Sequence, residues 1–262
     1  MKFIDAHIHL SDPEYEGKVG EIIKDARQSN VVALVSNSMN LKSSLLSLQL
    51  ADENPEFIFA ALGIHPWNVK TLSQDEVQNT VDLILQHNKH EGKIVAVGEI
   101  GLDHKYARNG KTRELQQEVF DEMLHASEKM SLPVIIHSRG TTPQILDLLP
   151  SYNVKKVLLH WFSRPRSLLP RIIDHSYYIT EGPPAVFSKG IREVVRRVPL
   201  TNLLTETDGP IRYRGPFSGR MTTPSLIPMI VEAIAELKDM DENDVADQIF
   251  HNFIAFFGVT PV

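Results

Sequence analysis

Eight short apolar runs alternate with helical stretches along the whole chain, and this alternation restricts the possible folds more than any other feature of the sequence. Most of the runs are continuously apolar, which is typical of parallel strands that are buried on both faces. The candidate strands are Phe3–Ala6, Val31–Val35, Phe57–Ala61, Ile94–Gly98, Pro133–Ile136, Val157–Leu159, Tyr177–Ile179 and Leu203–Thr205.

The segments between these runs carry helix signals. Apolar residues recur on a helical period, and capping residues precede several of the stretches. Ser73 and Glu76 have the spacing of a capping box, and Thr142 before Pro143 is expected to be an N-cap. The other expected helices include an apolar stripe from Val19 to Ala26, Ser44–Asn54, a long helix from Leu115 to Met130, a weak Ser163–His175 interrupted by Pro170, Ser188–Val198, Pro224–Asp239, and Asp241–Phe257, which Gly258 ends.

Eight strands, each followed by a helix and without a linker or a change in composition, predict an α/β fold: one (β/α)8 TIM barrel domain over residues 1–262. The alternative is an open doubly wound sheet. That fold would require a glycine-rich phosphate loop after an early strand, and the sequence has none.

Composition excludes several classes of protein. The 262 residues include no cysteine, so disulfides, thiolate metal sites and cysteine nucleophiles are absent. We find no signal-peptide pattern and no apolar run long enough to span a bilayer, so we expect a cytoplasmic protein without membrane contact. The net charge is -6, but twelve of the Lys and Arg residues and only five acids lie between residues 151 and 220, an excess that mildly favours an anionic substrate.

Ionisable residues cluster where the predicted strands end, which is where TIM barrels carry their function. Alternation along the first strand places Asp5, His7 and His9 on one face. The other candidates at strand ends are His65, Glu99, His137, His160 and Asp208. Imidazole nitrogens and carboxylate oxygens suit divalent metals, and there are enough of them for two ions.

The order and spacing of these motifs resemble the TatD family of metal-dependent deoxyribonucleases, which are amidohydrolase-like barrels. The resemblance covers nearly the whole chain, and its most specific block is Gly98-Glu99-Ile100-Gly101-Leu102-Asp103. The other matching stretches are Phe3-Ile4-Asp5-Ala6-His7-Ile8-His9, Gly63-Ile64-His65-Pro66, Pro133-Val134-Ile135-Ile136-His137-Ser138-Arg139, His160-Trp161-Phe162-Ser163 and Thr205-Glu206-Thr207-Asp208-Gly209-Pro210.

The resemblance implies a site for two divalent metal ions: zinc, magnesium or manganese. It assigns one ion to His7, His9 and Asp208, the other to His137 and His160, and a bridging position to Glu99. The implied reaction is phosphodiester hydrolysis of DNA or another phosphate-containing substrate by a metal-activated water, with exonuclease action as one form of it. No obligate protein partner is evident from the sequence.

The remaining expected roles concern proton transfer and substrate. Asp208 is expected to act as the general base, with Glu181 as the next candidate. His65 is expected to lie away from the metal ligands and to donate a proton to a phosphate or leaving oxygen. Arg139 is expected to bind phosphate, and Glu206, also on the substrate side, to hydrogen-bond a ligand histidine.

Three positions depart from the family pattern on what we expect to be the substrate side. They are Arg164 after the sixth strand, Glu181 after the seventh, where an extra acid approaches the mouth, and Thr222 after the eighth. Two other functions stay open at this point. One is an amidohydrolase-type reaction on a small-molecule amide, lactone or phosphoester, and the other is an inactive metal-binding scaffold.

Overall fold

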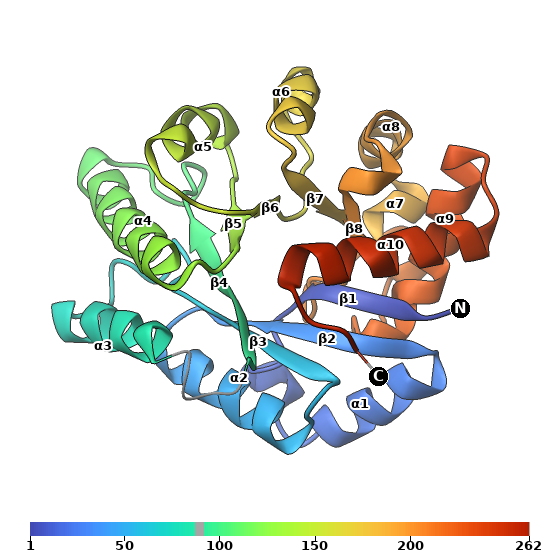
Figure 1. Cartoon of the computed structure of the whole chain (residues 1–262), viewed down its shortest axis with the longest axis horizontal. Coiled ribbons are helices and arrows are strands. Elements are labelled where there is room, and N and C mark those ends of the chain that lie inside the picture. Colours follow the sequence, from blue (N-terminus) through green and yellow to red (C-terminus); the bar gives the residue numbers. More distant parts are fainter. Residues whose placement is uncertain (87–91, 262) are drawn as a thin grey trace.

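The strands form one eight-stranded parallel sheet in sequence order, as the alternation predicts. The computed structural model describes residues 1–86 and 92–261. Helices surround the strands (Figure 1), which confirms the TIM-barrel architecture. The strands are β1 (Phe3–Ile8), β2 (Val31–Asn37), β3 (Ile58–Leu62), β4 (Ile94–Gly101), β5 (Val134–His137), β6 (Val157–Leu159), β7 (Tyr178–Glu181) and β8 (Leu203–Thr205).

Strands β6 and β8 have the expected bounds, whereas several others extend further at their C-terminal ends. In β4 the sheet continues through Glu99 to Gly101, and in β1 it continues through His7 to Ile8. The strands continue past these polar residues because regular pairing resumes beyond them: Ile8 pairs with Ser36 and Gly101 pairs with His137.

The described helices connect successive strands or follow the last one (Figure 1). They are α1 (Val19–Gln28), α2 (Leu41–Glu53), α3 (Gln74–Leu85), α4 (Gly110–Met130), α5 (Thr142–Leu148), α6 (Leu169–Asp174), α7 (Pro184–Phe187), α8 (Lys189–Arg197), α9 (Ile227–Lys238) and α10 (Glu242–Phe257). Short 3-10 turns lie at Pro13–Tyr15, Leu149–Ser151, Arg166–Leu168, Leu200–Asn202, Gly215–Phe217 and Pro224–Leu226. In the described part of the chain, no helix is both long enough and apolar enough to cross a membrane.

Most of the expected helix signals act where they were predicted. Ser73 and Glu76 form a capping box at α3, and Gly258 ends α10 with a φ of 73°. The N-cap of α5 is Thr141, not Thr142, whose hydroxyl instead donates to the Ser138 carbonyl oxygen at 3.1 Å. Pro170 does not interrupt α6 but lies in its first turn, where the missing N–H of proline is harmless.

The first and last strands lie side by side and close the barrel. The Thr205 hydroxyl donates to the Ile4 carbonyl oxygen at 2.7 Å, and the Asp208 N–H donates to the His7 carbonyl oxygen at 2.9 Å. Helix α10 packs across β1 and β8 at this junction (Figure 1). The closure places Asp208 beside the end of β1.

Asp5 strengthens this junction from inside the barrel. Its carboxyl group accepts hydrogen bonds from the backbone N–H of His7 at 3.2 Å and of Thr207 at 3.0 Å, and it also bonds the Thr207 hydroxyl at 2.5 Å. Burial raises the pKa of Asp5 to about 8, against the opposing effect of the Thr207 bonds. The buried carboxyl is therefore largely neutral at pH 7.

We expect Asp5→Ala to lower the free energy of unfolding by about 2–4 kcal/mol, because it leaves buried donors of His7 and Thr207 without an acceptor. Urea denaturation at neutral pH measures this loss. Asp5→Asn is the control: it keeps an acceptor oxygen and the neutral charge, so it should cost much less. Equal losses in the two variants would contradict the hydrogen-bonding role.

Candidate metal centre

Glu99 lies at the centre of the cluster of ionisable residues. One of its carboxylate oxygens, Oε2, faces the end of β1, 3.3 Å from His7 Nε2 and 3.1 Å from His9 Nε2. Asp208 approaches the same two nitrogens, with its Oδ1 3.6 Å from His7 Nε2 and 3.5 Å from His9 Nε2. Two imidazoles and the Asp208 carboxylate thus lie on one side of Glu99.

The second oxygen of Glu99, Oε1, faces a different group of imidazoles. It lies 2.8 Å from His160 Nε2, 2.9 Å from His137 Nδ1 and 3.2 Å from His65 Nε2. The strands that carry Glu99 and His137 approach closely here because residue 101 is glycine: a Cβ at Gly101 would lie 2.1 Å from the His137 carbonyl oxygen. The single carboxylate therefore separates two sets of nitrogen donors.

Hydrogen bonds on the outer side of two histidines determine which nitrogen faces the centre. His9 Nδ1 lies 3.0 Å from the Asn37 carbonyl oxygen, which only accepts, so in the neutral imidazole Nδ1 carries the proton and Nε2 presents its lone pair. His137 Nε2 lies 3.1 Å from Asp103 Oδ2, so this histidine presents Nδ1 instead. Such outer bonds are typical of metal-binding histidines.

Glu206 lies on the outer side of His160. Its Oε2 lies 3.5 Å from His160 Nδ1 and accepts a 2.5 Å hydrogen bond from the Thr180 hydroxyl. Glu181 is fully buried close by, and neither of its oxygens has a hydrogen-bond partner among the described residues. Burial, reinforced by the charge of Glu206, raises the pKa of Glu181 well above its usual value and so favours the neutral form of this acid.

The position of His65 differs from the expectation. We expected it to lie away from the other candidates, but its Nε2 is 3.2 Å from Glu99 and 3.3 Å from His137 Nδ1. The expectation was wrong because the loop after β3 folds back over the barrel mouth. The backbone N–H of Trp67 donates to His65 Nδ1 at 3.1 Å, so in the neutral imidazole Nε2 carries the proton. Unlike His9 and His137, His65 points a donor toward Glu99.

The charges at the centre are those of a cation site. Burial opposes the charge of Glu99, but the surrounding imidazoles outweigh burial and hold its pKa well below the usual range. Burial also lowers the pKa of His9, yet its ion pairs with Asp208 and Glu99 prevail and raise that pKa to about 10. The pKa of Asp208 is lowered, since His9 and other histidines outweigh its burial. Two ionised carboxylates thus attract positive charge to this point.

The residues present fit divalent cations. The Nε2 atoms of His7 and His9 lie 3.3 Å apart, and Glu99 Oε2 and His7 Nδ1 are buried without a hydrogen-bond partner among the described residues. Lone pairs that face one another in this way are stabilised by a shared cation. Three-residue groups with metal-ligand spacing are His7–His9–Glu99, His65–Glu99–His137 and His7–His160–Glu206.

The structure also places the remaining predicted residues and shows one contact that was missed. The side chains of Arg139 and Arg164 are exposed at the rim. Thr222 is buried, and its backbone carbonyl oxygen accepts a hydrogen bond from the Tyr15 hydroxyl. Sequence reasoning assigned no role to Asp103, the partner of His137, although a carboxylate that ends the most specific motif was a usable signal.

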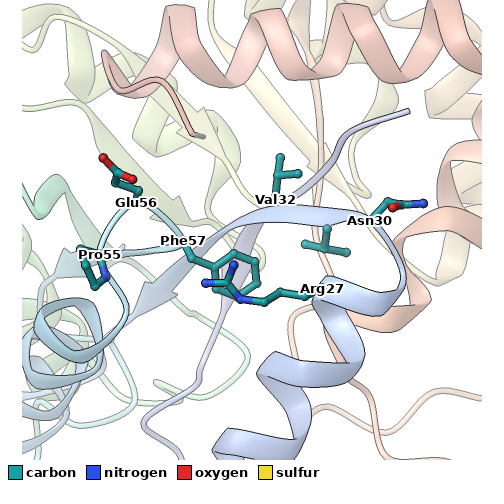
Figure 2. Close-up of a pocket in the computed structure, with 7 residues that line it drawn as sticks. Arg27, Asn30, Val32, Pro55, Glu56 and Phe57 are labelled. Carbon is teal, nitrogen blue, oxygen red and sulfur yellow. The ribbon is translucent and has the colours of Figure 1, made fainter.

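A pocket of about 280 Å³ opens beside His9 and is lined by the loop after β1 and the start of α2, including Met39, Lys42 and Leu46. Another pocket, of about 300 Å³, lies at the opposite end of the barrel, where β2 and β3 begin. Figure 2 shows Arg27 crossing Phe57 there, with the guanidinium 3.9 Å from the ring centroid. Because that pocket contains none of the clustered histidines, we place the chemistry at the β-strand C-termini.

The chain resembles known proteins over nearly its full length. It is 29% identical over 259 residues to the uncharacterized metal-dependent hydrolase YabD of Bacillus subtilis, covering 97% of this chain and 98% of that protein. It is 28% identical over 261 residues to the human deoxyribonuclease TATDN3, covering 97% and 94%.

A solved structure agrees with this relationship. The crystal structure of YjjV, a TatD homologue from Escherichia coli, matches with a TM-score of 0.88 at 28% identity and covers 98% of each chain. The family described as TatD related DNase matches residues 4–258. With this match over almost every residue, the chain belongs to the TatD family of metal-dependent hydrolases.

Proposed function

We propose that this chain, as one domain over residues 1–262, is a deoxyribonuclease that uses two divalent cations. His7, His9 and Asp208 would hold one cation and His137 and His160 the other, with Glu99 between them. The observation that carries this proposal is the pair of Glu99 oxygens, which face two separate sets of imidazole nitrogens. A structural metal site normally needs only one closed set of four ligands.

When bound, cations of this kind would neutralise phosphate charge and lower the pKa of a water molecule toward about 7. Asp208 stays ionised beside His7 and His9, so its carboxylate can orient the attacking water and accept its proton. His65 presents its Nε2–H and can donate to a phosphate or leaving oxygen. Arg139, exposed at the rim, would bind a more distant phosphate.

An amidohydrolase-type reaction on a small amide, lactone or phosphoester is the second candidate function. The same donors would then polarise a carbonyl group, and the relative YabD is named only as a metal-dependent hydrolase. The name of human TATDN3 and the excess of basic residues between 151 and 220 favour DNA instead. An inactive scaffold is disfavoured by the complete set of donors.

The decisive assay incubates labelled single-stranded DNA with protein loaded separately with zinc, manganese or magnesium. We expect the DNA to be shortened with at least one metal, and the activity to disappear with a chelator and to return when the metal is restored. Lactones and cyclic amides are tested in parallel. If these compounds are hydrolysed and the DNA is left uncleaved, the proposal is overturned in favour of the second function.

We expect His65→Ala to leave both metals bound and to lower turnover by about 10²-fold, because it removes a positioned donor and no lone pair. Metal content is measured by elemental analysis and turnover with the DNA substrate. His65→Gln is the control, since its amide retains a donor and should recover part of the rate. A parallel loss of metal and activity in His65→Ala would make His65 a ligand.

Metal binding should release protons. With its pKa raised to about 10, His9 is protonated in the metal-free protein at neutral pH and must lose that proton to bind a cation. Affinity should therefore rise with pH between about pH 6 and pH 8, by up to about tenfold per pH unit for each proton released. Calorimetry in buffers of different ionisation enthalpy measures the release. Heats that are independent of the buffer would contradict this linkage.

A further inference from the structure

The stacked rings of Trp67 and Tyr106 extend from the candidate metal centre to solvent, and we call this pair the aromatic step. The Trp67 ring lies 4.9 Å from the His65 ring and 6.1 Å from the His137 ring, measured between centroids. Tyr106, from the loop after β4, stacks on Trp67 with centroids 5.9 Å apart and an angle of 28° between the planes. The Lys70 ammonium lies 5.0 Å from the Tyr106 ring.

Asp103 holds both rings in this arrangement. One carboxylate oxygen accepts a 2.6 Å hydrogen bond from Trp67 Nε1, and the other accepts from the backbone N–H of Tyr106 at 2.9 Å. The same carboxylate bonds His137, so the step is joined to the metal centre through one buried residue. Despite this support, Tyr106 remains 41% exposed, an unusual position for a ring that serves packing alone.

The loops around this step are strongly basic. They follow β3, β4, β5 and β6 and comprise residues 63–73, 102–109, 138–141 and 160–168, in which the one acid is the buried Asp103. The exposed cations in these loops are Lys70, Lys105, Arg108, Arg139, Arg164 and Arg166. In contrast, residues 9–18 after β1 contain three acids and one lysine. A polyanion is therefore attracted to the arc of the mouth that carries Trp67 and Tyr106.

We propose that Trp67 and Tyr106 form a stacking platform for an unpaired base of a single-stranded nucleic acid. Every nucleobase has a π-face, so such a platform binds without a sequence code, while the surrounding cations contact the phosphates. A duplex keeps its bases paired and cannot use the platform in this way. The inference deepens the proposed function, on which it rests for the strand's path to the metal centre, but base-dependent binding can be tested without hydrolysis.

The test compares two strands of equal length and charge, an oligothymidylate and a fully abasic tetrahydrofuran strand. Binding is followed by tryptophan fluorescence with the metal-loaded Asp208→Asn variant, in which we expect hydrolysis to be slowed by roughly 10²–10⁴-fold. We expect the oligothymidylate to bind more tightly. Adding Tyr106→Ala should weaken its binding by about 5- to 100-fold, the range for one lost base stack, and should change binding of the abasic strand less than about twofold.

Three further variants separate stacking from folding. Tyr106→Phe keeps the π-face and should bind like the parent, whereas Tyr106→Leu covers Trp67 without a π-face and should resemble Tyr106→Ala. Tyr177→Ala is the matched control, because Tyr177 also stacks on a neighbouring ring, that of His175 at 5.2 Å, but precedes β7 at the opposite end of the barrel. It should leave binding of both strands unchanged.

Equal weakening of both strands by Tyr106→Ala, or no weakening of either, would overturn the platform. The outcome is distinguishable from failure of the proposed function. If the wild-type protein hydrolyses no DNA but the base-dependent difference persists, the platform stands and the deoxyribonuclease proposal fails. If DNA is hydrolysed and Tyr106 has no base-dependent effect, the deoxyribonuclease proposal stands and the platform fails.

Discussion

Glu99→Ala is expected to abolish hydrolysis and to empty at least one of the two proposed cation positions. The reason is geometric: Glu99 Oε2 lies within 3.3 Å of the His7 and His9 Nε2 atoms, and Oε1 lies within 2.9 Å of the facing nitrogens of His137 and His160. Removing this carboxylate takes a ligand from both sets at once. Elemental analysis of the purified variant and the DNA assay measure the two effects.

Glu99→Gln is the control for this experiment. It keeps the shape of the side chain and one oxygen, but it removes the negative charge that attracts two cations. We expect it to retain more metal than Glu99→Ala and to stay far below wild-type activity. Full occupancy of both positions in Glu99→Ala would rule out the bridging role and leave Glu99 as a partner of the histidines alone.

Asp208→Asn should lower turnover by roughly 10²–10⁴-fold, the range typical of a lost general base. Its carboxylate lies 3.6 and 3.5 Å from the His7 and His9 nitrogens, a separation that lets an amide oxygen at this position share a cation with them. The amide cannot accept the proton of an attacking water. We therefore expect at least one metal to remain bound and the substrate affinity to change little, as measured by separate kcat and KM values.

Near-normal turnover of Asp208→Asn at saturating substrate and metal would make Asp208 a ligand only. Glu181 was the next candidate for the base, but its environment argues against that role. It is fully buried, and burial raises its pKa well above the usual value, which favours the protonated form and makes it a poor proton acceptor. Glu181→Gln, which keeps the neutral shape, is therefore the matched control and should have a small effect on turnover.

The sequence by itself was sufficient for the barrel and for the set of clustered residues. Continuous apolar runs and helical periods are local signals, and they located all eight strands of the sheet. Because the C-terminal ends of parallel barrel strands meet at one mouth, residues as distant as His7, Glu99 and Asp208 could be expected to converge. The structure places His7 Nε2 3.3 Å from Glu99 Oε2 and 3.6 Å from Asp208 Oδ1.

Strand ends and helix starts were less predictable. Polar residues such as Glu99 and His137 stay in the sheet because neighbouring strands and the buried cluster hold them there, and polarity alone suggests a loop. Thr142 shows the same limit on a smaller scale. Its hydroxyl bonds a carbonyl four residues earlier, a choice that depends on the path of the preceding loop.

Only the tertiary structure decided which ring nitrogen each histidine presents to the centre, and which side chains surround the barrel mouth. His137 presents Nδ1 because Asp103 accepts from its Nε2, and His65 presents a donor because the Trp67 N–H occupies its Nδ1. These contacts join loops that follow different strands, and no periodicity in the chain encodes how such loops fold over one another. The stacking of Trp67 on Tyr106 has the same origin: it arises where two loops 39 residues apart in sequence number meet above one barrel.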